Sequence, residues 1–154
     1  MKRLIIRKAQ NTDAALLAKF NVANALESEA LALDTHIALE GVKAVLLDTN
    51  KGIYYVAERN GELVGALMIT QEWSDWRACW KWWLQSVYVL PEFRGQGVFD
   101  ALLSEVEQDA QKAGVRQLAL YMDQQNQRAE KAYIKNAFVS SHYLMLEKEL
   151  FIKK

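Results

Sequence analysis

Three β-rich runs follow one another in the middle of the chain with no helical pattern between them, and this succession limits the folds open to the sequence. The first two runs, residues 53–58 and 63–70, flank Asn60-Gly61, a dipeptide typical of tight hairpins because both positions accept positive φ. The third run, residues 80–90, stops at Pro91, which has no N–H to donate to a strand ladder. The sequence therefore predicts an antiparallel meander in this region.

Helical periodicity lies on both sides of this meander. Before it, Asn11-Thr12-Asp13 offers capping side chains to apolar residues at helical spacing, and a second helical pattern ends near Asn50. After it, the pattern from Val98 to Ala113 is followed by Gly114, as expected at a helix C-terminus. The elements expected outside the meander are a strand at 3–8, helices at 16–23, 37–47, 98–113 and 126–135, and strands at 117–122 and 138–150. The resulting order is β-α-α-β-β-β-α-β-α-β.

Composition excludes several classes of protein. Nineteen Lys and Arg residues balance nineteen Asp and Glu residues among 154, so no cationic excess is available for a nucleic-acid backbone or a membrane surface. The single cysteine, Cys79, cannot form an internal disulfide, and with His36 and His142 distant in sequence no zinc-ligand spacing is present. No apolar run approaches the roughly 20 residues of a membrane span. We expect a single cytoplasmic domain over residues 1–154, with no metal, nucleic acid or membrane as partner.

The segment from Val87 to Val98 joins a β-rich run to the strongest helical pattern through a short turn, Arg94-Gly95-Gln96-Gly97. The first N–H groups of a helix lack intrahelical partners, and the helix dipole adds about half a positive charge there, so backbone alone can hold a pyrophosphate. Gly95 and Gly97 lack the Cβ that would keep phosphate oxygens away from those groups. The alternative is that the two glycines only form a tight turn.

These residues resemble the GNAT superfamily of acyl-coenzyme A-dependent N-acetyltransferases, in which a strand reading V-x-V-x-P is followed by R/Q-x-x-G-x-G/A. The match runs from Arg94 to Phe99, and Phe99 replaces the family's usual small residue. A second family segment, N-x-x-A with a downstream Tyr and a G-F pair, is similar to 126–129 followed by Tyr133 and Ala137-Phe138. Ala137 stands where glycine is common. The resemblance spans essentially the whole chain.

The resemblance implies a layered, mixed α/β fold with a mostly antiparallel sheet of six or seven strands and helices on both faces. It also implies acetyl-coenzyme A as co-substrate, with its pantetheine arm between a splayed fourth and fifth strand. Asn126 would lie near the pantetheine and Tyr133 near the sulfur. The other residues that the resemblance places at the co-substrate are the strand residues Val87, Tyr88 and Val89 and the turn residues Arg94, Gly95, Gln96, Gly97, Val98 and Phe99.

The implied reaction, acetyl transfer from a thioester to an amine, needs two proton transfers. An amine of pKa about 10.4 is neutral in only about one molecule in two thousand at pH 7, so a base, a water chain or a desolvated pocket must remove its proton. The departing thiolate needs a donor, and a phenol of pKa near 10 is protonated and suited to the role. Tyr133 is the candidate general acid; the alternative is a half-buried packing residue.

The sequence identifies neither the amine acceptor nor the general base. The segment 72–77 is similar to diamine and polyamine acetyltransferases, but those enzymes carry acids where this chain has Gln85 and Ser86. A water relay could end on backbone carbonyls or on one of the acids Glu27, Glu29, Glu40 and Asp75. We expect transfer to a primary amine of a small molecule, amino acid or peptide by direct attack in a ternary complex. The alternative is a non-catalytic acyl-coenzyme A-binding module, and a homodimer is an open alternative to a monomer.

Five tryptophans fall between residues 73 and 83. Alternation along a strand puts Trp80 and Trp82 on one face and Trp83 on the other. A strand buried on both faces explains most of them. An aromatic wall of the acceptor pocket, attracting a cationic amine, is the alternative.

Overall fold

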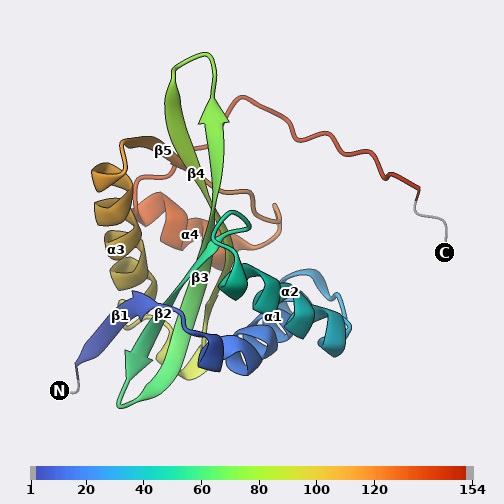
Figure 1. Cartoon of the computed structure of the whole chain (residues 1–154), viewed down its shortest axis with the longest axis vertical. Coiled ribbons are helices and arrows are strands. Elements are labelled where there is room, and N and C mark those ends of the chain that lie inside the picture. Colours follow the sequence, from blue (N-terminus) through green and yellow to red (C-terminus); the bar gives the residue numbers. More distant parts are fainter. Residues whose placement is uncertain (1–2, 152–154) are drawn as a thin grey trace.

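The structure, a computed structural model of the chain, describes residues 3–151, so the ends of the predicted domain, 1–2 and 152–154, lie outside the described part. In chain order its elements are β1 (Leu4–Lys8), a 3-10 turn (Asn11–Asp13), α1 (Ala14–Glu29), α2 (Thr35–Leu47), β2 (Ile53–Arg59), β3 (Glu62–Ser74), β4 (Cys79–Val89), a second 3-10 turn (Pro91–Phe93), α3 (Val98–Lys112), β5 (Val115–Ala119) and α4 (Gln127–Lys135) (Figure 1). No helix within residues 3–151 combines the length and the apolar character needed to cross a membrane.

The predicted meander is confirmed. β1 to β4 pair antiparallel in sequential order, and β5 adds to β4 in parallel. The β2–β3 hairpin turns at Asn60 and Gly61, whose φ angles of 57° and 79° are the positive values that the dipeptide predicted. β3 is longer than expected, β4 is displaced by one residue from the expected 80–90, and the joined ends of the two strands project beyond the helices as a two-stranded arm (Figure 1).

Alternate strand residues supply two separate cores. Tyr55 belongs to the core under α3, with Leu102 at its centre. Its neighbour Tyr54 faces the opposite way, into a core with Leu17 of α1 and Val42 of α2. Helices therefore cover both faces of the sheet, as expected, and β4 lies between them.

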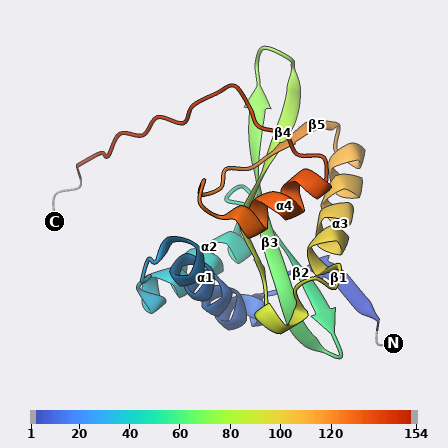
Figure 2. The ribbon, with the colours of Figure 1, turned by 180° about the vertical axis from the view of Figure 1, so that it is seen from behind.

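The expected last strand, 138–150, and a sheet of six or seven strands are wrong for the described residues, because the sheet there has five strands. Phe138 is the last residue anchored to the body: its N–H donates to the Tyr133 carbonyl (3.0 Å), and its side chain packs against the core. Beyond it the chain runs as an extended segment away from the body, as both views show (Figures 1 and 2). Apolar, β-prone residues specify a strand only when a neighbouring strand is available to pair with them.

Candidate active site

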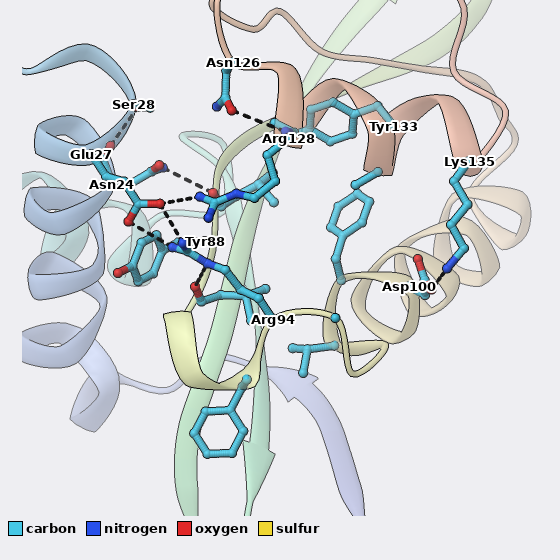
Figure 3. Close-up of a pocket in the computed structure, with 18 of the residues that line it drawn as sticks. Asn24, Glu27, Ser28, Tyr88, Arg94, Asp100, Asn126, Arg128, Tyr133 and Lys135 are labelled. Atoms are coloured by element: carbon cyan, nitrogen blue, oxygen red, sulfur yellow. Dashed lines mark hydrogen bonds and ion pairs between the residues drawn. The ribbon is translucent and has the colours of Figure 1, made fainter.

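A pocket of about 680 Å³ lies between α1, the end of β4, the turn before α3, and α4 (Figure 3). Of the residues that the sequence predicted at the co-substrate, all but Gln96 line it, and Tyr133 lines it as well. The Gln96 side chain lies elsewhere: it donates to the Glu92 carbonyl (2.9 Å) and accepts from Arg59 (2.8 Å). Residues far apart in sequence therefore meet at one cavity.

The parallel strands β4 and β5 stop pairing at this pocket. The last paired residues of β4 and β5 are Trp83 and Ala119, whereas β4 continues to Val89. Ser86, with a φ of 52°, lies where the pairing with β3 shifts register. Beyond Trp83, no strand within residues 3–151 pairs with β4 on its β5 side, which is the splay that the resemblance implied.

Two side chains already bind carbonyl groups at the end of β4. The Asn24 amide of α1 donates to the Val87 carbonyl (3.2 Å), and Arg94 Nε donates to the Val89 carbonyl (2.9 Å). A carbonyl oxygen has two lone pairs, so each can still accept a second hydrogen bond. The strand edge is thus held in place without being closed to a ligand.

The turn before α3 leaves its backbone open. Gly95 and Gly97 have φ angles of 75° and 80°, which glycine adopts without strain. A Cβ built on either glycine meets no atom within 4 Å, so the space beside this backbone is free. Because the first N–H groups of α3 point from its N-terminus, this turn fits a pyrophosphate.

Three charged side chains join the two walls of the pocket. Glu27 of α1 receives Arg94 through both of its oxygens (2.7 and 2.9 Å) and also pairs with Arg128 of α4 (Figure 3). The hydrogen bond from Arg94, with that from Arg128, lowers the pKa of the Glu27 carboxyl. The Arg94 guanidinium also lies 5.4 Å from the centre of the Tyr88 ring.

A second link joins α4 to α3. Asp100 accepts hydrogen bonds from Lys135 (3.1 Å) and from the amide of Asn136 (2.9 Å). These bonds lower the pKa of the Asp100 carboxyl, the one from Asn136 most strongly. Both carboxylates in the pocket lining therefore already have partners.

Tyr133 is fixed by aromatic contacts. Its ring lies edge-on to Phe99 (5.5 Å between centroids) and to Phe138 (5.8 Å). Burial raises the pKa of its hydroxyl above the ordinary value of 10.0, so the group stays protonated at neutral pH. Phe99, which departs from the family pattern, thus fills space against the ring that carries the candidate acid.

Asn126 begins α4 as predicted. Its side-chain oxygen accepts from the Ala129 N–H (3.3 Å), the usual bond of a helix cap. The two N–H groups of the same amide are donors that this cap does not use. They can serve a ligand in the pocket.

Several residues of the pocket were not predicted from the sequence, and the acid of the proton relay was not chosen among four candidates. Arg128 lies inside the N-x-x-A segment, and its charge was the available signal; Asn24, Ser28 and Lys135 carried none. Of the four acids considered for a relay, only Glu27 lines the pocket.

Neither a strand buried on both faces nor an aromatic wall of the acceptor pocket accounts for all five tryptophans. Trp82 is 5% exposed and belongs to the core, but Trp73, Trp76 and Trp80 are exposed on the projecting arm. None of the five tryptophans is among the lining residues of the pocket.

Comparison with known proteins agrees with this geometry. The model of the acetyltransferase (GNAT) family matches residues 21–138. The aminoalkylphosphonate N-acetyltransferase of Salmonella typhimurium is 32% identical over 111 residues, which cover 72% of this chain and 71% of that protein. The crystal structure of a possible acetyltransferase from Clostridium difficile 630 has a TM-score of 0.89 and 36% identity, covering 97% of this chain and 99% of the other.

A more distant structure, a predicted acetyltransferase with acetyl-CoA from Clostridium acetobutylicum, shares the fold at 17% identity and a TM-score of 0.77, covering 94% of this chain and 96% of that one. The family match covers most of the chain and includes the turn before α3, the end of β4 and Tyr133. This protein therefore belongs to the GNAT family of acetyltransferases.

Proposed function

We propose that this protein transfers the acetyl group of acetyl-coenzyme A to the primary amine of a small molecule, amino acid or peptide, by direct attack in a ternary complex. One observation supports this most: a single pocket connects the open turn at Gly95 and Gly97, the free edge of β4 and the Tyr133 side chain. These are a phosphate site, a slot for an extended chain and a proton donor. The relative that acts on aminoalkylphosphonates supports a small primary amine as acceptor.

The co-substrate would bind along this route. Its pyrophosphate would accept hydrogen bonds from the first N–H groups of α3 and gain from the positive end of the helix. Its pantetheine amides would pair with the edge of β4 near Val87 and with the free N–H groups of Asn126. This places the thioester at the Tyr133 end of the pocket.

The chain's own groups then supply the proton at sulfur. The neutral amine forms a C–N bond to the thioester carbonyl carbon, and the C–S bond breaks with its electron pair moving to sulfur. Tyr133 donates its hydroxyl proton to that sulfur, and the proton lost by the amine returns through water to restore the phenol. Glu27 is a weak base for the amine because its two arginines lower its pKa. A water relay is therefore the proposed base.

An acceptor panel tests the reaction. Purified protein with acetyl-coenzyme A and a set of amines, including 2-aminoethylphosphonate, amino acids, a peptide and spermidine, should release thiol faster than without acceptor. Varying both substrates should give intersecting double-reciprocal lines, as a ternary complex requires. Tight binding of acetyl-coenzyme A with no acceptor-dependent thiol release from any amine would favour the non-catalytic binding module instead.

The phosphate role of the turn has its own test. Gly97→Glu should abolish acetyl-coenzyme A binding in calorimetry, because its carboxylate would occupy and repel the pyrophosphate position. Gly61→Glu is the matched control: Gly61 also has positive φ and open space around its Cβ position, but it lies on the β2–β3 turn. Both variants carry the same backbone strain, about 1–2 kcal/mol. If a folded Gly97→Glu protein bound acetyl-coenzyme A with undiminished affinity, the turn would not be the pyrophosphate site.

A further inference from the structure

One side chain of the turn before α3 points away from the pocket. Gln96 does not line the cavity, and its amide is used elsewhere: the nitrogen donates to the Glu92 carbonyl (2.9 Å), and the oxygen accepts from Arg59 (2.8 Å). The neighbours of Gln96 in the chain do line the cavity: Arg94, Gly95, Gly97 and Val98. The Gln96 side chain therefore ties the turn to its surroundings from the side opposite the pocket.

Arg59 reaches this turn from the β2–β3 hairpin. It is the last residue of β2, and the hairpin lies at the same end of the sheet as the turn (Figures 1 and 2). Besides its hydrogen bond to Gln96, its guanidinium carbon lies 5.9 Å from the centre of the Phe93 ring, which lines the pocket. Arg59 thus contacts the segment at two points, one on each side of Gly95.

The Arg59 guanidinium is held in this position at a cost. Its Nε atom is buried and has no hydrogen-bond partner among residues 3–151. A buried donor without a partner loses the hydrogen bonds that water gives it in the unfolded chain. Long cationic side chains usually keep their charged end in water and bury only the stem. The burial of Arg59 Nε therefore indicates that the contacts made by the rest of this guanidinium matter to the protein.

A turn with two glycines needs such contacts if it is to bind an anion well. Gly95 and Gly97 have more backbone freedom than other residues, and freedom that is lost on binding weakens affinity. One restraint, the ion pair of Arg94 with Glu27, lies in the pocket, where a phosphate-bearing ligand would compete for it. The restraint at Gln96 lies outside the pocket. It can therefore hold the turn both before and after a ligand binds.

We propose that Arg59 is a positioning residue for the co-substrate. Acting through Gln96, it holds the N–H groups of residues 95–98 in the arrangement that receives the pyrophosphate, and it does not touch the ligand itself. This inference rests on the function proposed above, because it takes the turn to be the pyrophosphate site. Loss of the Arg59 contact should therefore weaken binding of coenzyme A and leave the chemical step unchanged.

A double-mutant cycle read by calorimetry with coenzyme A tests the link. Arg59→Met and Gln96→Met should each weaken binding by about 3- to 10-fold, and the double variant should bind no more weakly than Gln96→Met alone. Losses that multiply in the double variant, or full affinity in either single variant, would overturn the inference. Gln96 is exposed, so Gln96→Met keeps the test open if Arg59→Met fails to fold. A parent protein that binds no coenzyme A would overturn the proposed function itself.

Salt and steady-state kinetics separate positioning from simple charge attraction. The ratio of parent to Arg59→Met affinity should be the same at low and high salt, because long-range attraction is screened and a turn held in place is not. Arg77→Met, which removes an exposed arginine from the β3–β4 turn, is the control and should bind coenzyme A like the parent. In the acetyl-transfer assay, Arg59→Met should raise KM for acetyl-coenzyme A and keep kcat. A loss of affinity that disappears at high salt, or a fall in kcat with unchanged KM, would show that Arg59 does not act by positioning the turn.

Discussion

At the scale of single residues, Glu27 shows how the pocket balances the charge of two of its cationic side chains. Its carboxylate neutralises Arg94 and Arg128, which come from a turn and a helix far apart in the sequence. A phosphate-bearing ligand in the same pocket would compete with Glu27 for these guanidinium groups. If the proposed co-substrate binds here, Glu27 would compete with it for the two arginines, besides linking α1 to α4 and to the turn before α3.

We predict that Glu27→Gln strengthens binding of coenzyme A by about 3- to 10-fold, the range of a partly exposed charge interaction. Calorimetry measures the affinity, and the effect should shrink as salt is raised. Glu29→Gln, an exposed acid on the same helix, is the control and should change nothing. Weaker binding by Glu27→Gln would instead show that Glu27 holds the arginines in a useful position.

Tyr133 gives the second prediction at this scale. Tyr133→Phe keeps the ring contacts with Phe99 and Phe138 and deletes only the hydroxyl. Turnover should fall by about 10- to 1000-fold, as expected for a positioned general acid. Affinity for acetyl-coenzyme A should stay within a few-fold. Tyr143→Phe, on the exposed segment, is the matched control. If turnover equalled that of the parent protein under conditions where chemistry limits the rate, Tyr133 would be a packing residue and not the general acid.

Some residues of the candidate site could be predicted from the sequence alone, and others could not. The residues from Val87 to Phe99 could be predicted because a strand, a glycine turn and a helix start are contiguous in the chain. The pairing of Glu27 with Arg128 could not, because it joins residues 101 positions apart and depends on how α1 and α4 approach each other. Charge on a helix indicates only an exposed face until its neighbour is known.

At the scale of elements, the contact of α3 with the sheet positions the turn at Gly95 and Gly97, where we propose that the pyrophosphate binds. Gly65 of β3 lies under the start of α3: a Cβ there would come within 2.9 Å of Val98 and 3.2 Å of the Tyr88 carbonyl. Gly65 therefore lets the helix N-terminus lie close to β4. The absence of a side chain at Gly65 thus sets how closely the start of α3 packs on the sheet.

We predict that Gly65→Ala lowers the free energy of unfolding by about 1–3 kcal/mol, the usual result of overpacking, and also weakens acetyl-coenzyme A binding by shifting the start of α3. Denaturant unfolding and calorimetry measure the two effects. Gly41→Ala, in a helix with nothing within 4 Å of its Cβ position, should be neutral or stabilising by about 0.5–1 kcal/mol. Full stability and affinity in Gly65→Ala would show that α3 adjusts freely.

Most helices and strands could be predicted from the sequence, and the exception is the strand expected at 138–150. Asn60-Gly61 and Pro91 determined the meander through backbone chemistry that holds in any context. The stretch after Phe138 has strand-forming residues, yet no local rule says which edge it pairs with. β5 was expected at 117–122 and lies at Val115–Ala119, a displacement of the kind that pairing with β4 decides.

At the scale of the whole molecule, a neutral chain contains a pocket with an excess of cations. The chain carries nineteen charges of each sign, but the pocket lining holds Arg94, Arg128 and Lys135 against Glu27 and Asp100. Both acids are already paired. A polycation would find no free carboxylate among these lining residues.

We therefore predict that spermidine and putrescine are poor acceptors, with kcat/KM at least about tenfold below that of the best monoamine or amino acid. A hydrogen bond to a charged group contributes about 1.5–3 kcal/mol, and about 1.4 kcal/mol corresponds to a tenfold change. A steady-state panel decides the order, with 2-aminoethylphosphonate as an amine whose anionic group suits the cationic lining. Spermidine as the best acceptor would mean that acids outside the pocket lining, such as Glu29 or Glu40, hold the second charge.

The placement of the tryptophans has a practical consequence for optical work on this protein. All five lie on β3, β4 and the turn that joins them, and none lines the pocket. Their fluorescence therefore reports on the projecting arm and, through Trp82, on the core under α3: iodide should quench Trp73, Trp76 and Trp80 readily and Trp82 poorly. Titration with coenzyme A should leave the emission spectrum nearly unchanged, so a tyrosine-selective or ligand-based signal is needed to follow events in the pocket.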